Sequence, residues 1–315
     1  MLNKLIQNNS PYNVSYYLIN ILIILLPISF IAGNLIINLN IFLIIFFGLI
    51  FYGIKIYELK LLFFDKFLIF IFAYLLFSGT FNSLGFSEYS LIIEDKNILL
   101  KSIAFLRYLF FYLIIRLLIQ ENILNFKLFF SVTSVCVIFV CLDLILQFIS
   151  GKDIFGYIKT QNKLSGPFGE EKIAGSYLQR FGIFSFFIIP LILKSKKKSY
   201  FIILSLFLFA LIFTSIVISG NRMPLLLFLL MFLMLFFIEK KLRGLIFIFF
   251  VIGCLFFLFI FYSDDAIRNY TSHFMNKSEQ ILTFLKEVIL LDETPQETNT
   301  YIKEFNNGYA AWLEN

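Results

Sequence analysis

The chain has 315 residues, of which 60% are hydrophobic and 20% aromatic, and it carries a formal net charge of +6. A soluble globular core cannot bury so many apolar side chains, and the apolar runs reach the length at which a helix crosses a bilayer. The composition therefore excludes a soluble protein and predicts an all-α polytopic membrane protein.

We expect nine membrane-spanning helices, each a run of about 17–25 apolar residues, although the third is shorter. In chain order they are Tyr16–Ala32, Leu35–Ile54, Phe67–Thr80, Ile98–Leu118, Leu128–Ser150, Ile173–Leu193, Tyr200–Ser219, Met223–Ile238 and Leu245–Tyr262. Residues 1–262 thus form a predicted transmembrane helical bundle. We expect no cleavable signal peptide, because residues 1–15 are polar and no cleavage site of small residues follows the first apolar run.

The basic residues of the short loops predict the orientation of the bundle. They lie between predicted spans two and three, six and seven, and eight and nine: Lys55, Lys60, Lys66, Lys194, Lys196, Lys197, Lys198, Lys240, Lys241 and Arg243. All three loops fall on one side of the membrane, which the positive-inside rule makes cytoplasmic. The amino terminus is then cytoplasmic and residues 263–315 are external.

Residues 263–315 differ in character from the bundle, because they are polar and mixed in charge. We expect a periplasmic loop or partial domain that is helical around Glu279–Leu291. The segment stops without a closing feature, so we expect either a chain cut within a larger external domain or a short tail. The lone histidine, His273, is expected to be an ordinary surface residue.

No pattern in the sequence predicts a cofactor, a metal or a nucleic acid. Cys136, Cys141 and Cys254 all lie in apolar runs, where cysteine behaves as a small hydrophobic residue. The sequence lacks a P-loop, a dinucleotide fingerprint and a metal-ligand spacing. The positive charge is explained by membrane topology, so a nucleic-acid partner is not expected.

Three arginines in or beside apolar helices are the candidate binding residues. Arg180 would lie about 10 Å below the external surface, Arg107 near the midplane, and Arg222 at the outer rim. An arginine in a span costs about 2.5–3.5 kcal/mol, so each of them needs a partner or a function. A planar guanidinium donates two parallel hydrogen bonds to a phosphate, which predicts a cationic site for an anionic lipid headgroup.

A structural role remains open for each arginine. Arg180 could form an ion pair with Asp143 or Glu171 that fastens helices together, and Arg222 could extend its side chain to the interface. Glu170 and Glu171 follow a Gly/Ser/Pro turn and precede a predicted helix. The helix dipole explains one acid there, and a catalytic role or an arginine partner would explain the other.

Two segments resemble the O-antigen ligase and polymerase-like superfamily. They are Leu164–Leu178, LSGPFGEEKIAGSYL, and Ser219–Arg222, SGNR, which precedes an apolar helix. The resemblance implies a bacterial inner-membrane glycosyltransferase that moves glycans from undecaprenyl diphosphate carriers at the periplasmic face. It implies a lipid bilayer and other polysaccharide-assembly proteins as partners. Arg180 and Arg222, and by extension Arg107, would hold the diphosphate, with Glu170 or Glu171 lining the site.

The sequence departs from that family at two points. Asn221 stands where members often carry an acid, and the family's candidate catalytic histidine would fall beyond Asn315, since His273 comes too early. The resemblance leaves a polymerase, which extends surface polysaccharide, and a ligase, which transfers O-antigen to lipid A core, as alternatives. A flippase or transporter for the same lipid-linked oligosaccharide, or an inactive fragment, is an alternative of another class.

Overall fold

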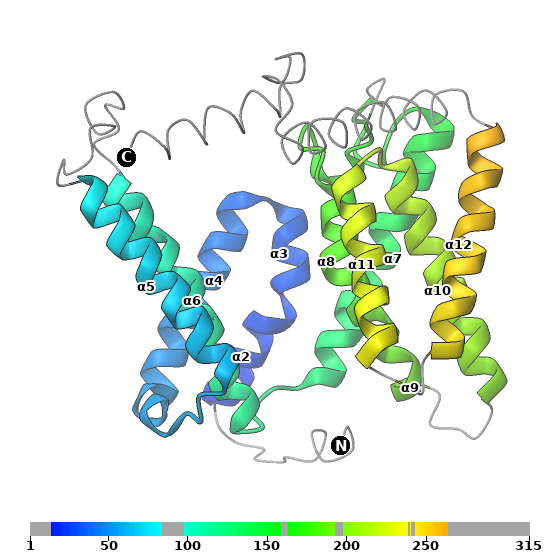
Figure 1. The fold of residues 1–315 in the computed structure, drawn as a ribbon. Coiled ribbons are helices and arrows are strands. Elements are labelled where there is room, and N and C mark those ends of the chain that lie inside the picture. Colours follow the sequence, from blue (N-terminus) through cyan, green and yellow to red (C-terminus); the bar gives the residue numbers. More distant parts are fainter. Residues whose placement is uncertain are drawn as a thin grey trace, which may run out of the picture. The chain divides into compact units, whose positions relative to one another are not determined.

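The computed structural model describes residues 14–83, 98–158, 163–192, 198–238, 240 and 243–263. This part of the chain is helical and has no strand, only an isolated bridge between Lys152 and Ile158 (Figure 1). Its elements are α2 Val14–Ile24, α3 Leu26–Ala32, α4 Asn34–Tyr52, η1 Gly53–Glu58, α5 Phe63–Ser83, α6 Ile98–Gln120, α7 Phe126–Ser150, η3 Gly166–Phe168, α8 Ala174–Phe186, α9 Ile188–Ile192, α10 Lys198–Ile218, α11 Arg222–Ile238 and α12 Arg243–Ser263. The predicted all-α class is confirmed for these residues.

Five of the described helices are long and apolar enough to cross a membrane: α4, which continues into η1, and α5, α6, α7 and α10. The pair α2–α3, bent by 46°, makes a sixth if it is one span. The structure therefore supports several spans, whereas the count of nine stays a prediction.

The predicted sixth span, Ile173–Leu193, is two helices rather than one. The α-helical pattern ends at Phe186, and the Phe187 amide donates to the Phe184 carbonyl at 3.2 Å, three residues back. Pro190 explains the break, because its ring has no N–H and clashes with the carbonyl four residues earlier. The result is a 13-residue α8 followed by the short α9.

The bend between α2 and α3 also lies beside a proline, Pro27, at the start of α3. Neighbouring helices bond the backbone carbonyls around it: the Asn40 amide of α4 donates to the Leu22 carbonyl at 3.1 Å, and the Tyr177 hydroxyl of α8 donates to the Pro27 carbonyl at 3.1 Å. A broken helix is tolerated in an apolar environment when neighbours bond the freed backbone groups.

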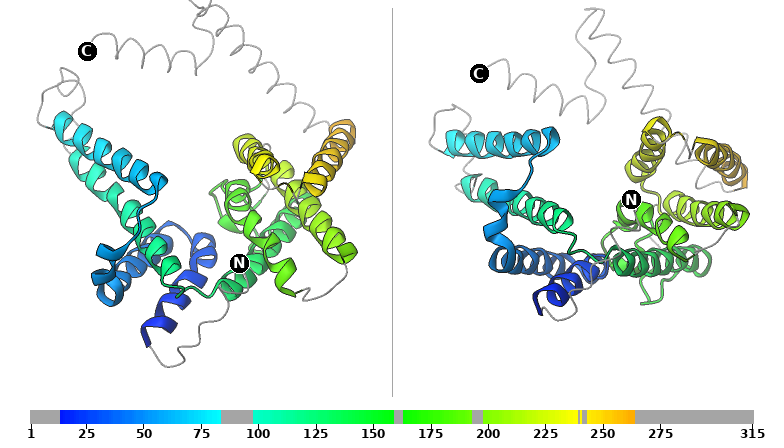
Figure 2. Two further views of the ribbon diagram at one scale, coloured as in Figure 1. Left: turned by 60° about the horizontal axis from the view of Figure 1, so that its bottom comes forward. Right: turned by 90° about the horizontal axis from the view of Figure 1, so that it is seen from below.

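Helices α5 and α6 run side by side (Figures 1 and 2). A charged cluster joins them. Asp65, buried near the start of α5, accepts hydrogen bonds from the Arg116 guanidinium at 3.2 and 3.3 Å and from the Leu62 amide at 2.7 Å. The Tyr112 hydroxyl, one turn before Arg116, also donates to Asp65. Both carboxylate oxygens are thus bonded, which makes this a satisfied ion pair within the helix pair.

Helix α8 packs against α7, α10 and α11 (Figure 1). Its buried face carries small residues, among them Gly175 and Gly182. A Cβ atom at Gly182 would lie 3.2 Å from Ile212 Cγ2 of α10. Small residues allow helix backbones to approach closely where lipid provides no hydrophobic driving force, so this face sets the position of α8.

Contacts within the chain group residues 1–249 into one compact unit and residues 250–315 into another. In the first unit, aromatic rings hold α10, α11 and the start of α12 together: Phe209 stacks on Phe249 with centroids 4.3 Å apart, and Phe232 meets Phe209 edge-on at 5.4 Å. The predicted boundary at residue 262 remains a prediction. Residues 264–315, with His273 and the helix expected around 279–291, lie outside the described residues.

Candidate functional site

The two segments that carry the family resemblance lie in contact, although residues 179–218 separate them in the sequence. The Leu164 amide donates to the Ser219 carbonyl at 3.2 Å, and the Asn221 side-chain amide donates to the Lys172 carbonyl at 3.0 Å. Gly175 makes this approach possible, because a Cβ atom there would lie 2.6 Å from Ser219 Oγ and 3.0 Å from Asn221 Cβ. The start of α8 and the α10–α11 turn therefore form one surface.

The loop between α7 and α8 is fastened to α7 by two buried polar side chains one turn apart. Asp143 Oδ1 accepts from the Ile154 amide at 2.8 Å, and Gln147 Oε1 accepts from the Gly166 amide at 2.9 Å. Gly166 adopts φ 56°, and a Cβ atom there would lie 3.2 Å from Leu144 Cδ2. Asp143 thus positions the loop. It does not form the ion pair with Arg180 that is one of the two alternatives from the sequence.

Glu170 and Glu171 are both exposed on this loop. Glu171 Oε1 accepts a hydrogen bond from the side-chain amide of Asn34 at 2.9 Å. Asn34 is the first residue of α4, so this bond joins the α3–α4 turn to the segment before α8. Glu171 therefore accepts a hydrogen bond from an amide and does not form an ion pair with Arg180, which was the second alternative from the sequence.

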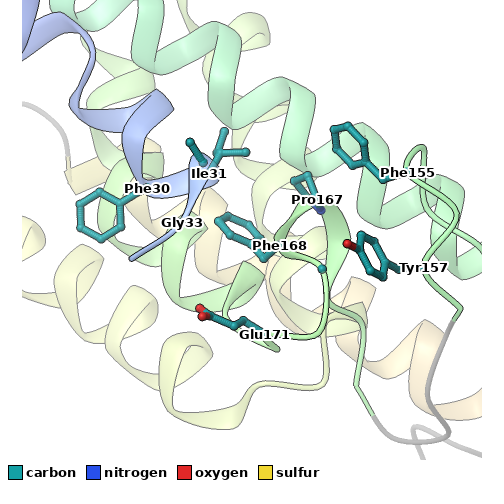
Figure 3. Close-up of a pocket in the computed structure, with 10 residues that line it drawn as sticks. Phe30, Ile31, Gly33, Phe155, Tyr157, Pro167, Phe168 and Glu171 are labelled. Carbon is teal, nitrogen blue, oxygen red and sulfur yellow. The ribbon is translucent and has the colours of Figure 1, made fainter. Parts of the chain in front are cut away.

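Glu171 also lines a pocket of about 500 Å³, which we call the aromatic pocket (Figure 3). Its walls come from the α3–α4 turn, the loop after α7 and η3: Phe30, Ile31, Ala32, Gly33, Phe155, Tyr157, Pro167, Phe168, Gly169 and Glu171. The Tyr157 ring closes one side beside Gly169, where a Cβ atom would lie 3.3 Å from Tyr157 Cζ. The pocket combines apolar ring faces with one carboxylate and one phenol.

Arg180 lies in the middle of α8 and is exposed. Among the described residues it has neither a hydrogen-bond nor an ion-pair partner. Arg180 follows Tyr177 by three residues, so the two are neighbours on the helix surface. Tyr177 contacts α3 through its hydrogen bond to the Pro27 carbonyl. An arginine without a carboxylate partner, about 8 Å along the helix axis from Gly175, is available for an anionic ligand.

The other two candidate arginines do not join Arg180 in the described contacts. Arg107 lies on α6, which packs against α4, α5 and η1, and its guanidinium donates to the Tyr108 hydroxyl at 3.0 Å. Arg222 begins α11, directly after the turn that contacts Gly175, and its side chain lies outside the described residues. The backbone thus places Arg222 next to the contact between the α10–α11 turn and the start of α8, five residues before Arg180 on α8, whereas Arg107 lies on another helix pair.

Three features of the structure are not visible in the sequence, one between α5 and α6 and two at this site. The Asp65–Arg116 pair was not predicted, because a charge at the end of an apolar run looks like an interfacial residue. Asn34 and the aromatic wall of the pocket carried no signal either. Phe30 and Tyr157 are 127 residues apart and meet only in the folded chain.

Within the described ranges, no group of three or more His, Cys, Asp or Glu side chains is placed to hold a metal ion. The chain matches no protein-family model, no curated protein and no solved structure at the significance required. The arrangement of the site is therefore the basis for assigning a function.

Proposed function

We propose that this protein is a bacterial inner-membrane glycosyltransferase of the polymerase or ligase type, which acts on undecaprenyl-diphosphate-linked oligosaccharides at the periplasmic face. One observation carries the proposal. The segments that resemble the O-antigen ligase and polymerase-like superfamily contact each other through Gly175, Ser219 and Asn221, and the helix that begins at this contact bears an arginine without a described partner.

Arg180 is the proposed diphosphate ligand, together with Arg222. Both are carried by helices that begin at the shared surface, α8 and α11. A guanidinium at this position stabilises the charge that grows on a departing diphosphate, because its planar fork donates two parallel hydrogen bonds to phosphate oxygens. The uncompensated cost of Arg180 in an apolar helix, about 2.5–3.5 kcal/mol, is then offset when the anion binds.

The proposed reaction is a direct displacement at the anomeric carbon of the carrier-linked sugar. A hydroxyl oxygen of the acceptor forms the new C–O bond, the bond between the anomeric carbon and the phosphate oxygen breaks, and the diphosphate leaves with the electron pair. The hydroxyl proton passes to a base, for which Glu171 or Glu170 is the candidate. The leaving group is already good, so the arginines and acceptor positioning provide most of the acceleration.

The topology that goes with this function has nine spans, a cytoplasmic amino terminus and an external surface formed by the α7–α8 loop and the α10–α11 turn. The lysine-rich loops between α9 and α10 and between α11 and α12 support this orientation under the positive-inside rule. Cysteine accessibility across intact cells at Lys163 and at Lys240 tests it: Lys163→Cys should react with an impermeant reagent and Lys240→Cys should not.

The function is tested in cells that lack the chromosomal copy of the gene and carry the full-length gene with Arg180→Ala or Arg180→Lys. We expect long-chain polysaccharide on gels to fall by about a hundredfold with Arg180→Ala, and by less with Arg180→Lys, which keeps the charge but loses the planar fork. The matched control is Arg243→Ala, because Arg243 bonds backbone carbonyls of α11 at 3.0 and 3.3 Å near the other helix end. Unchanged polysaccharide with Arg180→Ala would refute the proposal.

A transporter for the same lipid-linked oligosaccharide is a second candidate, because two helices are interrupted beside a proline. They are α2–α3, bent by 46° before Pro27, and α8–α9, which is interrupted at Phe187, three residues before Pro190 of α9. Interrupted helices in two parts of a chain are typical of secondary transporters. Vesicles that contain the purified protein and a labelled lipid-linked oligosaccharide distinguish the two functions. A transporter moves the labelled oligosaccharide across the bilayer and leaves its length unchanged.

A further inference from the structure

We propose that the aromatic pocket binds a sugar ring of the acceptor glycan, with the Glu171 carboxylate and the Tyr157 hydroxyl as its polar contacts. This inference rests on the proposed function, because it identifies the part of the site that receives the acceptor. The pocket volume of about 500 Å³ lies within the range of small-molecule sites.

The walls of the pocket suit the apolar faces of a sugar ring. Phe30 comes from α3, Phe155 and Tyr157 from the loop after α7, and Phe168 from η3, so rings from three segments surround one space (Figure 3). The C–H groups on one face of a pyranose form an apolar patch that packs against an aromatic ring, whose polarisable face attracts them. Such contacts hold a ring in place and leave its hydroxyl groups at the edge.

The polar groups of the pocket can bond those hydroxyl groups. Glu171 is held by the 2.9 Å hydrogen bond from Asn34, which leaves further acceptor positions on its carboxylate. The Tyr157 hydroxyl can both donate and accept. Sugar hydroxyl groups also both donate and accept, so different hydroxyl groups of one ring can bond the carboxylate and the phenol.

An organic cation is the competing ligand, since aromatic rings and a carboxylate also attract positive charge. A quaternary ammonium ion, however, offers the Tyr157 hydroxyl no acceptor, and it would compete with the Asn34 amide for Glu171. The mixture of donors and acceptors therefore favours a polyhydroxyl ligand.

The position of Glu171 links the pocket to the proposed reaction. It lies on the pocket wall and directly precedes the Lys172 carbonyl that bonds Asn221 of the second resemblance segment. A sugar in the pocket would thus present a hydroxyl group to a carboxylate next in sequence to the contact between the two resemblance segments. Tyr157, Phe168 and Asn34 would act in acceptor binding rather than in holding the diphosphate.

The test is a direct binding measurement with the purified full chain in lipid nanodiscs. The probe is the soluble oligosaccharide that mild acid releases from the host's own lipid-linked glycan, detected by saturation-transfer-difference NMR, with tetramethylammonium as a second probe. We expect the oligosaccharide to bind, and both Tyr157→Ala and Phe168→Ala to weaken binding by about fivefold or more. Tyr57→Ala is the matched control, because Tyr57 lies in η1, 94% exposed and outside the pocket lining.

Arg180→Ala separates this inference from the proposed function. The free oligosaccharide has no diphosphate, so Arg180→Ala should leave its affinity unchanged while polysaccharide synthesis fails. If synthesis survives Arg180→Ala but Tyr157→Ala still weakens sugar binding, the proposed function is wrong and the sugar site stands. The sugar site is refuted if the wild-type chain does not bind the oligosaccharide, if Tyr157→Ala and Phe168→Ala bind it normally, or if tetramethylammonium alone binds.

Discussion

Two arginines within apolar helices have opposite surroundings. Arg116 of α6 meets Asp65 of α5 at 3.2 Å, and a tyrosine hydroxyl and a backbone amide complete the carboxylate's bonding. Arg180 of α8 is exposed and has no such partner among the described residues. Arginine therefore joins two helices at position 116, whereas at position 180 it has no described partner and can bind a ligand.

The two arginines differ in how the cost of a charge in an apolar helix is met. A charged group in an apolar helix is costly, and the cost is met either by a fixed partner in the chain or by something that binds. Asp65 accepts four hydrogen bonds, so its carboxylate has no acceptor position left for a ligand, and Arg116 has its charge compensated within the chain. The Arg180 guanidinium, in contrast, has no described partner, so its hydrogen-bond donors can bind a ligand. Substitutions can remove the partner of Arg116 or give a partner to Arg180.

The largest loss of stability is expected for Asp65→Leu. This substitution leaves Arg116 without a carboxylate partner, as Arg180 is, but at a place where no ligand is proposed to bind. Removal of one partner of a buried pair leaves an uncompensated charge. We expect the melting temperature in detergent to fall further than with Gly175→Ala, Ser176→Glu or Lys55→Ala. The double variant Asp65→Leu/Arg116→Leu should recover about half of the loss or more, and equal melting temperatures for the single and double variants would contradict the pair's assigned role.

Gly175→Ala tests the contact that positions Arg180. Its Cβ atom would lie 2.6 Å from Ser219 Oγ and would push α8 away from the α10–α11 turn. We expect a loss of about 1–3 kcal/mol in the free energy of unfolding and a parallel loss of polysaccharide synthesis. Gly182→Ala is the control on the same helix face, since its Cβ atom would meet Ile212 at 3.2 Å, a contact that a small side-chain shift relieves.

Ser176→Glu converts Arg180 into a paired arginine, because residues four apart on a helix are neighbours and the acid precedes the base. We expect a small gain in stability, about 0.3–0.5 kcal/mol, together with about a tenfold fall in polysaccharide synthesis. Ser176→Gln has nearly the same size without the charge and should retain synthesis. Loss of synthesis to the same extent in both variants would indicate a steric effect instead of charge pairing.

The smallest effect is expected at the Lys55–Glu121 pair, where the lysine side chain is 48% exposed. Exposed pairs are screened by solvent and gain little, so Lys55→Ala should leave the melting temperature unchanged within error. The melting temperatures of Lys55→Ala and Asp65→Leu are measured in parallel by differential scanning fluorimetry. A drop comparable to that of Asp65→Leu would show that exposure does not distinguish the two pairs.

The helical class and most helix positions follow from the sequence, because apolar runs of spanning length have few other structures available. Breaks at Phe187 and Leu25 were not predicted, although Pro190 and Pro27 were visible, since proline also occurs in continuous spans. The two resemblance segments and their arginines are visible in the sequence, but their contact is not, and Asn34 bonds Glu171 only through tertiary folding. Asp65 and Arg116 are 51 residues apart, and periodicity carries no information about such pairs.

The most direct test of the account is the affinity of the purified chain for a soluble polyprenyl diphosphate, geranylgeranyl diphosphate, measured by native mass spectrometry. Wild type and Arg243→Ala should bind it equally, Arg180→Ala should bind it at least about tenfold more weakly, and geranylgeranyl monophosphate should bind less tightly than the diphosphate. Equal affinity of wild type and Arg180→Ala for the diphosphate would contradict the claim that Arg180 is kept unpaired to bind a phosphorylated lipid carrier.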